Sequence, residues 1–384
     1  YMKWATNITK QGVLKVPCIP VIEDGKNLLP NAQLKKICTG SGTLKDSYGN
    51  PIVWQETLGV HLEKAGTTID WKYIEADLQL VIEIKATNGN TYSYHVGEHC
   101  ISETMAYMIE NTIYNNVIES PSDFPYRVVN YVCDYLMPGF SQDPLNVIAL
   151  CDACLMHSFP GRALYYGLNI LKKYENLTPE GVYNIMVSPQ LLQETGVPQN
   201  LTIEHLLKIR KDDAVNQMSG YFTANYDSMI TWTTQMLEAA YAIRIKNPYF
   251  MLEIARGRDI RNNKAFIDVL NEIGCPVIMN NQNNMVYIRN NNIKDNVHPP
   301  VFNVISQIYS IMNRNVLEHN TYKCQLMDWC HKDFLTTGQK DLTTDGDSCR
   351  YAPWERVREE DIHQCYFGQI WYTWGLKDVI PNNE

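Results

Sequence analysis

Two cysteines and a histidine form the sharpest local cluster of reactive side chains in this sequence. Cys151 and Cys154 are separated by two residues, and His157 follows three residues later. This spacing is typical of zinc binding or thiol redox chemistry, because thiolates three positions apart can share a metal ion or form a disulfide. A structural zinc site needs four ligands, and no second pair follows at a usual spacing. Two buried thiols on one helical face are the simpler interpretation, with metal binding as the alternative.

No other segment carries a complete catalytic motif. The segment 39–43, Thr-Gly-Ser-Gly-Thr, resembles part of a phosphate-binding loop but lacks the Gly-Lys-Ser/Thr that completes one. The sequence contains neither Gly-x-Ser-x-Gly nor His-Glu-x-x-His. A catalytic triad assembled from distant residues is left open. We therefore predict a protein that is not an enzyme, with no cofactor and no small-molecule substrate. A late group of Cys and His residues has no recognisable ligand spacing: Cys324, Cys330, His331, Cys349, His363 and Cys365.

Basic residues gather in two places that could contact RNA phosphates. The denser group comprises Arg256, Arg258, Arg261 and Lys264, and a second group comprises Lys208, Arg210 and Lys211. Guanidinium groups pair with phosphate oxygens, and the preceding Tyr249 and Phe250 could stack on bases. Acidic residues are interleaved with both groups, so a solvated face of ion pairs is the favoured interpretation. The net charge of −9 also argues against a generic nucleic-acid coat.

The C-terminal segment concentrates aromatic residues that are typical of protein interfaces. Trp and Tyr dominate the binding energy of many interfaces when they enter a partner's pocket. The alternative is that this segment packs on the core of its own chain. The candidate interface residues are Tyr366, Phe367, Trp371, Tyr372 and Trp374.

Composition indicates an ordinary globular protein of 384 residues, with 45% hydrophobic and 20% charged side chains. This length favours two or three sub-domains. No apolar run approaches the roughly 18 residues that a membrane-spanning helix needs, so we predict no membrane association. The 11 cysteines are scattered without the close pairing of a small secreted scaffold, which favours reduced thiols in a cytosol. The chain begins at Tyr1 rather than Met, and we expect an interior start from which an N-terminal arm is missing.

Hydrophobic patterning predicts an α+β fold, with a predominantly helical body and a β-hairpin-rich N-terminal region. Alternating apolar residues on both sides of Asn88-Gly89 predict a hairpin over residues 77–96, and Tyr48-Gly49-Asn50 marks another turn. From residue 101 the period becomes helical, with Ser102 as the expected first cap. Helices are predicted over 102–117, 126–136, 146–157, 162–174, 202–218, 226–246, 263–273, 301–317 and 322–334, and after the caps Thr178 and Ser188.

These elements suggest four regions along the chain. Residues 1–100 are β-rich, residues 101–274 form a helical core domain, residues 275–300 form a projecting β-hairpin, and residues 301–384 hold C-terminal helices and the aromatic tail. We interpret the whole as a self-assembling structural protein, such as a viral coat, capsid or nucleocapsid subunit in a virion or host cytoplasm. Its expected partners are copies of itself. The alternatives are an RNA-binding subunit and a cytosolic enzyme or thiol/metal protein centred on Cys151, Cys154 and His157.

Overall fold

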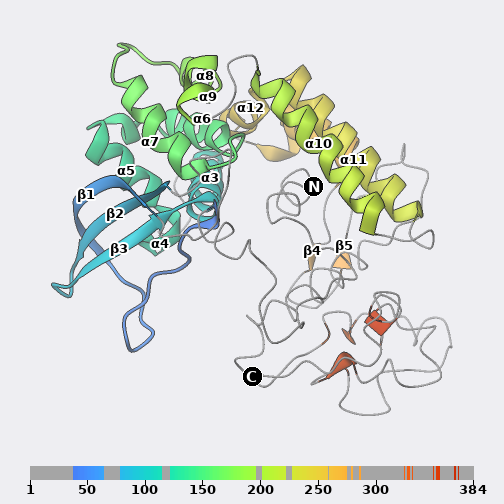
Figure 1. Cartoon of the computed structure of the whole chain (residues 1–384), viewed down its shortest axis with the longest axis horizontal. Coiled ribbons are helices and arrows are strands. Elements are labelled where there is room, and N and C mark those ends of the chain that lie inside the picture. Colours follow the sequence, from blue (N-terminus) through green and yellow to red (C-terminus); the bar gives the residue numbers. More distant parts are fainter. Residues whose placement is uncertain are drawn as a thin grey trace. The chain divides into compact units, whose positions relative to one another are not determined.

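A computed structural model describes residues 38–64, 78–114, 122–195, 201–221, 227–257 and 259–274, and scattered shorter stretches up to residue 371. The fold is mostly helical with a three-stranded antiparallel sheet near the N-terminal end, which confirms the predicted α+β class (Figure 1). The chain divides into two compact units. The first comprises Tyr1–Gly12, Pro30–Ala214 and Leu237–Glu272, and the second comprises Val13–Leu29, Val215–Met236 and Ile273–Glu384.

The sheet of the first unit is a meander of three neighbouring strands. β1 (Trp54–Lys64) pairs with β2 (Leu78–Ala86), and β2 pairs with β3 (Thr91–Val96), both antiparallel. The predicted hairpin is confirmed, since β2 and β3 flank the Asn88-Gly89 turn. The pleat directs Leu80, Ile82 and Ile84 of β2 to the same face, and all three are fully buried in the core that the sheet shares with the helices.

A second predicted turn precedes the sheet. Lys45 and Pro51 form an isolated antiparallel bridge, and the chain reverses between them. Gly49 adopts a φ of 86°, a left-handed conformation that costs glycine little because it has no Cβ. This small hairpin is the blue loop that projects below the sheet in Figure 1.

Most helices of the first unit lie close to their predicted positions. They are α3 (Glu98–Ile113), α4 (Asp123–Tyr126), α5 (Val128–Leu136), α6 (Pro144–Cys154), α7 (Pro160–Leu171), α8 (Pro179–Met186) and α9 (Pro189–Glu194), with a 3₁₀ turn η1 (Phe140–Gln142) before α6. Thr178 and Ser188 cap α8 and α9 as predicted, by accepting hydrogen bonds from Gly181 N and Leu191 N.

The predicted start of the first helix was wrong. α3 begins at Glu98, so Ser102 lies within the helix, where its hydroxyl donates to the carbonyl of His99. The physical reason lies in a backbone crossing at Gly97, just before the helix. A Cβ on Gly97 would stand 2.5 Å from the backbone nitrogen of Gly40. Glycine therefore lets the segment after Cys38 cross the chain directly at the helix start.

The remaining described helices are α10 (Ile203–Tyr221), α11 (Asp227–Lys246), α12 (Phe250–Arg256), η3 (Ile260–Asn262) and α13 (Lys264–Ile273). α12 was not predicted, whereas α13 ends before Gly274 as expected. In the second unit, β4 (Ile278–Met279) and β5 (Met285–Val286) pair antiparallel at the predicted hairpin. The helix predicted over 301–317 lies outside the described residues. Of the helix predicted over 322–334 only Cys324, Met327, Asp328 and His331 are described, and the last three are helical. Within the described part, no helix has the length and apolarity needed to cross a membrane.

α6 is the central element of the first unit's core. It packs against α3, α8 and α12, and its residues from Asn146 to Cys154 are all buried. One continuous core joins the buried face of the sheet with the helices from α3 to α9 and with α12. A charged side chain on α6, such as that of Asp152, therefore needs a partner inside the protein.

Candidate functional site

The Cys-x-x-Cys pair lies on α6 and belongs to a larger group of buried thiols. Cys151 and Cys154 are fully buried, and so are Cys100 on α3 and Cys133 on α5. These four residues, the core thiols, lie close enough together to interact electrostatically. All four are free cysteines. Sequence reasoning missed Cys100 and Cys133, because only tertiary packing brings α3 and α5 to α6.

Burial determines the protonation state of the core thiols. Loss of solvent raises the pKa of Cys100 to about 12. It raises the pKa of Cys133, Cys151 and Cys154 well above the usual value, with neighbouring thiols adding to the effect. The thiolate is the form that attacks electrophiles and binds metals. At neutral pH these residues are therefore protonated core side chains.

His157 serves to connect backbone segments. Its side chain is buried, with Nε2 2.8 Å from the carbonyl of Met186 and Nδ1 3.4 Å from the hydroxyl of Thr195. These contacts link the end of α6 to α8 and α9. Across the described residues, no group of three or more His, Cys, Asp or Glu side chains has an arrangement that could hold a metal ion.

The most consequential residue of the motif is the one after its first cysteine. Asp152 accepts two hydrogen bonds from Arg244 of α11, 2.8 Å from Nη1 and 2.9 Å from Nη2. Arg244 also donates to the carbonyl of Pro248 at 3.0 Å, and its guanidinium lies 4.4 Å from the ring centre of Phe250. Asp152 is only 3% exposed and Arg244 9%. The signal for this pair was an acidic residue inside an apolar run, which requires a buried partner.

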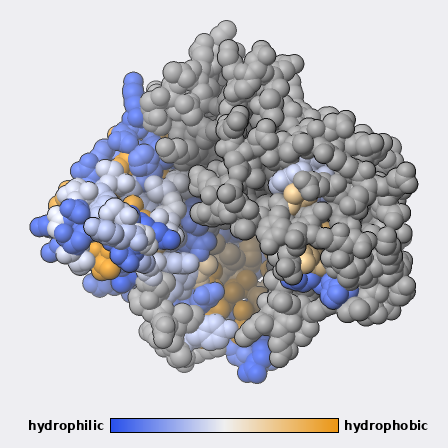
Figure 2. All heavy atoms as spheres, turned by 90° about the horizontal axis from the view of Figure 1, so that it is seen from below, coloured by the Kyte–Doolittle hydropathy of each residue, from blue (hydrophilic) through white to orange (hydrophobic). Residues whose placement is uncertain are grey.

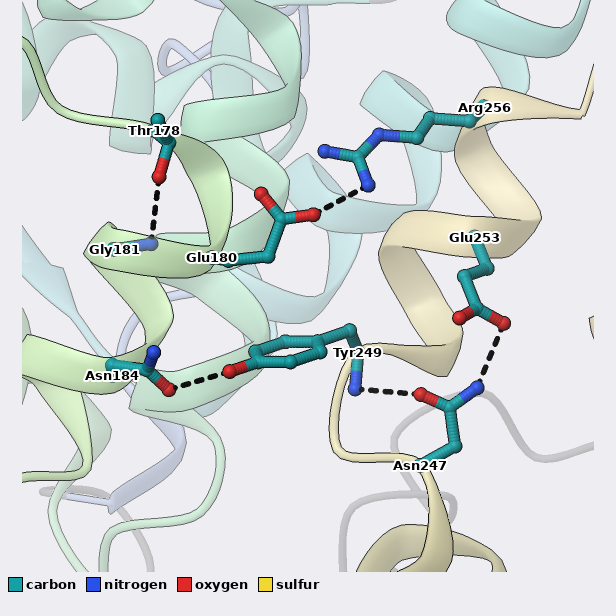
Figure 3. Close-up of polar contacts among 8 residues, drawn as sticks. All are labelled: Thr178, Glu180, Gly181, Asn184, Asn247, Tyr249, Glu253 and Arg256. Carbon is teal, nitrogen blue, oxygen red and sulfur yellow. Dashed lines mark hydrogen bonds and ion pairs between the residues drawn. The ribbon is translucent and has the colours of Figure 1, made fainter.

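The basic residues around α12 are held in ion pairs, as the interleaved acidic residues suggested. Arg256 contacts Glu180 of α8 at 2.5 Å (Figure 3). Arg261 contacts Asp259 at 3.0 Å, and Lys264 contacts Asp268 at 2.5 Å. Arg258 lies outside the described residues.

The aromatic residues before α12 are also engaged within the chain. The hydroxyl of Tyr249 donates to Asn184 Oδ1 at 2.8 Å, while Asn247 joins the Tyr249 backbone to Glu253 (Figure 3). The ring of Phe250 lies against Arg244. These rings therefore pack α12 onto its neighbours.

The three residues of the second basic group lie in different environments on α10. Lys208 is exposed. Arg210 donates to the carbonyl of Met156 at 2.7 Å and to the hydroxyl of Ser158. Burial lowers its pKa to about 10, which leaves it charged at neutral pH. Lys211 is buried and pairs with Glu238 and Asp212. The structure thus does not present these three cations as one exposed surface.

Two of the C-terminal aromatic residues lie in the described part of the second unit. Phe367 and Trp371 are buried and stacked, with ring centres 5.6 Å apart, and Trp354 lies 6.4 Å from Trp371. This is the arrangement expected if the segment packs within its own chain. Tyr366, Tyr372 and Trp374 lie outside the described residues, so their role at an interface stays a prediction.

Exposed large hydrophobic side chains are scattered over the first unit, and several of them lie near the sheet, where sequence reasoning did not place them. Tyr48 is 89% exposed, Tyr135 46% and Leu58 43%. Figure 2 shows a described surface that is largely hydrophilic and interrupted by smaller hydrophobic areas. The signal for Tyr48 was its position beside Gly49-Asn50, within a turn that points away from the core.

Comparisons with known proteins give no relative for this chain. No protein-family model matches it, and neither the curated proteins nor the solved structures contain a match.

Proposed function

We propose that this chain is a self-assembling structural protein, of the class of viral coat, capsid or nucleocapsid subunits, acting in a virion or in the host cytoplasm. The observation that carries the proposal is the exposure of large hydrophobic side chains on rigid parts of the first unit. Tyr48 is 89% exposed, and Tyr135 and Leu58 are close to half exposed, while the sheet and helices beside them pack on a buried core. Exposed aromatic side chains on preorganised elements bind partners at a low entropic cost.

The surroundings of these side chains support a contact role. Tyr48 lies in a turn closed by hydrogen bonds from Tyr48 N and Asn50 N to the carboxylate of Asp46, at 2.9 and 2.8 Å. Tyr135 is fixed at the end of α5, where its hydroxyl donates to the carbonyl of Leu58 at 3.4 Å. These hydrogen bonds hold each tyrosine in one geometry, as a repeated contact between identical subunits requires.

The polar interior supports the same proposal. Asp152 and Arg244 neutralise each other in a bidentate pair, and His157 joins three helices through hydrogen bonds. Burial keeps the core thiols protonated. These groups stabilise one rigid arrangement of the subunit.

Electron microscopy and light scattering of the purified chain at micromolar concentration and physiological salt test this function. We expect large, regular particles or filaments whose amount rises with protein concentration. A protein that stays monomeric throughout this range contradicts the proposal. The ratio of nucleic-acid absorbance to protein absorbance in the same sample tests RNA as a partner. Bound RNA raises this ratio, and added salt lowers it again by releasing the RNA.

A further inference from the structure

The turn at residues 45–51, here called the tip, and the β1–α5 patch of Leu58, Asp134 and Tyr135 have complementary chemistry. We propose that the tip of one copy docks on the β1–α5 patch of a second copy. This inference rests on the proposed self-assembly and names the two surfaces that make the contact. It concerns only residues of the first unit, all of which are described.

The tip is rigid because one carboxylate organises it. Asp46 accepts hydrogen bonds from the backbone of Tyr48 and Asn50 through Oδ1, and from the Asn50 side chain through Oδ2 at 3.1 Å. The Asp46 backbone N–H donates to Asn50 O at 2.9 Å, and Gly49 N donates to Asp46 O at 3.0 Å. These bonds lower the pKa of Asp46, so the carboxylate stays ionised and turned into the turn.

The tip therefore presents a cation and a phenol ring outward. Lys45 and Tyr48 are both exposed, with Tyr48 the most exposed large hydrophobic side chain of the described residues. Tyr combines a large contact area with few rotatable bonds, which makes it an efficient anchor at interfaces. A surface complementary to the tip has apolar side chains for the Tyr48 ring and a carboxylate for Lys45. The Asp46 carboxylate is engaged by the hydrogen bonds of the turn, so the Lys45 ammonium is the charge that the tip offers to a partner.

The β1–α5 patch offers this combination. Leu58 lies at an irregularity of β1, where the register shifts between Thr57 and Gly59, and its side chain points to solvent. Tyr135 reaches the carbonyl of Leu58. The adjacent Asp134 is exposed, and Ser141 holds its carboxylate by a hydrogen bond of 2.6 Å to Oδ1.

The patch is rigid like the tip. α5 is fixed on β1 by the rings of Trp54 and Tyr131, which stack with centres 4.2 Å apart. The β1 backbone is fixed at the same place, because Trp54 N donates a hydrogen bond to Asp123 Oδ2 at 2.8 Å. Lys45 of the tip and Asp134 of the patch are exposed side chains of opposite charge on the same chain. This favours a second copy as the occupant, because every subunit supplies both halves of the contact.

Such a contact joins different surfaces of the two copies. A head-to-tail contact of this kind produces a closed ring or an open filament, depending on the rotation between neighbours. The inference thus explains how a single repeated contact could build the regular assemblies that the proposed function expects.

Site-specific cross-linking of the purified full chain tests the docking directly. A photoreactive phenylalanine analogue at position 48 should give covalent dimers, with the adduct on β1 or α5 near Leu58 and Tyr135. The same analogue at Tyr174, which is 46% exposed against 89% for Tyr48 and lies just after α7, is the control and should give few dimers. Assemblies that form without a cross-link from position 48, or with adducts elsewhere, overturn this inference and leave self-assembly intact. A chain that remains monomeric refutes both.

Charge exchange provides a second, independent test. Lys45→Glu and Asp134→Lys should each weaken assembly about tenfold or more, and the double variant should recover most of the loss. Tyr48→Ala should weaken assembly by a similar factor. Asn88→Ala, in the other hairpin turn of the sheet, is the control and should leave assembly unchanged. Circular dichroism checks that each variant is folded. The proposed contact is contradicted if the double variant assembles as weakly as the two single charge variants, or if Tyr48→Ala has no effect on assembly.

Discussion

Replacing Asp152 by Ala should strongly destabilise the first unit, because the change leaves the guanidinium of Arg244 buried without its carboxylate. Arg244 is 9% exposed and would keep uncharged neighbours in place of the carboxylate, namely the carbonyl of Pro248, the ring of Phe250 and the side chain of Tyr183. Removing one partner of a buried ion pair costs about 3–5 kcal/mol, most of which is the penalty of the remaining charge. A neutral amide in Asp152→Asn should recover part of this loss.

The loss should appear as a shift in urea unfolding, followed by far-ultraviolet circular dichroism. With a denaturant dependence of about 2 kcal/mol per molar urea, a loss of about 3–5 kcal/mol lowers the midpoint by roughly 1.5–2.5 M. Unfolding can be assigned to the first unit by hydrogen exchange of α6 and α11 peptides, which carry the two residues.

A double-mutant cycle separates the pair from the packing around it. Arg244→Met alone leaves the Asp152 carboxylate buried and should cost a similar free energy. The double variant Asp152→Ala with Arg244→Met removes both charges, so its cost should lie well below the sum of the two single changes. Additive costs, or a loss below about 1 kcal/mol for Asp152→Ala, would refute the assignment of this pair as a buried structural element.

Three further predictions concern other parts of the first unit. Gly97→Ala should cost about 1–3 kcal/mol or more in urea unfolding, because its Cβ meets the Gly40 backbone, whereas Gly42→Ala has nothing within 4 Å and should be nearly neutral. The core thiols should resist alkylation in the native protein and react after unfolding, as peptide mass spectrometry can show; rapid native labelling would contradict their burial. Glu180→Gln should cost less than about 1 kcal/mol, because its contact with Arg256 is partly exposed. Since Arg256 lowers the pKa of Glu180 from 4.5, this small stabilisation is present above that pH and lost as the pH falls further, which unfolding at neutral and acidic pH can measure.

Much of the secondary structure followed from local chemistry. The Asn88-Gly89 hairpin, the capped starts of α8 and α9, and the end of α13 before Gly274 all depend on residues within a few positions of each boundary. A turn or cap satisfies backbone groups locally, so its residues can be recognised without knowledge of the rest of the fold.

Boundaries that depend on tertiary contacts were not predictable in this way. α3 begins four residues before Ser102 because the backbone crossing of Gly40 and Gly97 fixes the path into the helix. α12 is only seven residues long and packs against α3 and α6. Short helices of this kind draw their stability from packing, and the local sequence carries little signal for them.

The thiol motif illustrates how spacing can mislead. Cys151 and Cys154 suggested chemistry, but burial in α6 makes them part of the core. The informative residue was Asp152, because an acidic side chain on a buried helix has to be neutralised by a partner. That partner, Arg244, lies 92 positions away in sequence. The need for a buried cation could be inferred from the pattern, whereas its identity required the fold.

Exposed contact residues raise a different difficulty, because the same residue type serves the core and the surface. Tyr94 is fully buried, whereas Tyr48 is 89% exposed, although both lie close to a hairpin turn. Their surroundings distinguish them: Tyr94 alternates with other inward residues of β3, while Tyr48 lies between Asp46 and Gly49, in the turn itself. In its turn, Tyr48 is held away from the core and is accessible to a partner. We therefore expect turn aromatics of this kind at the surface, whereas an aromatic-rich segment such as residues 366–374 can pack within its own chain, as Phe367 and Trp371 do.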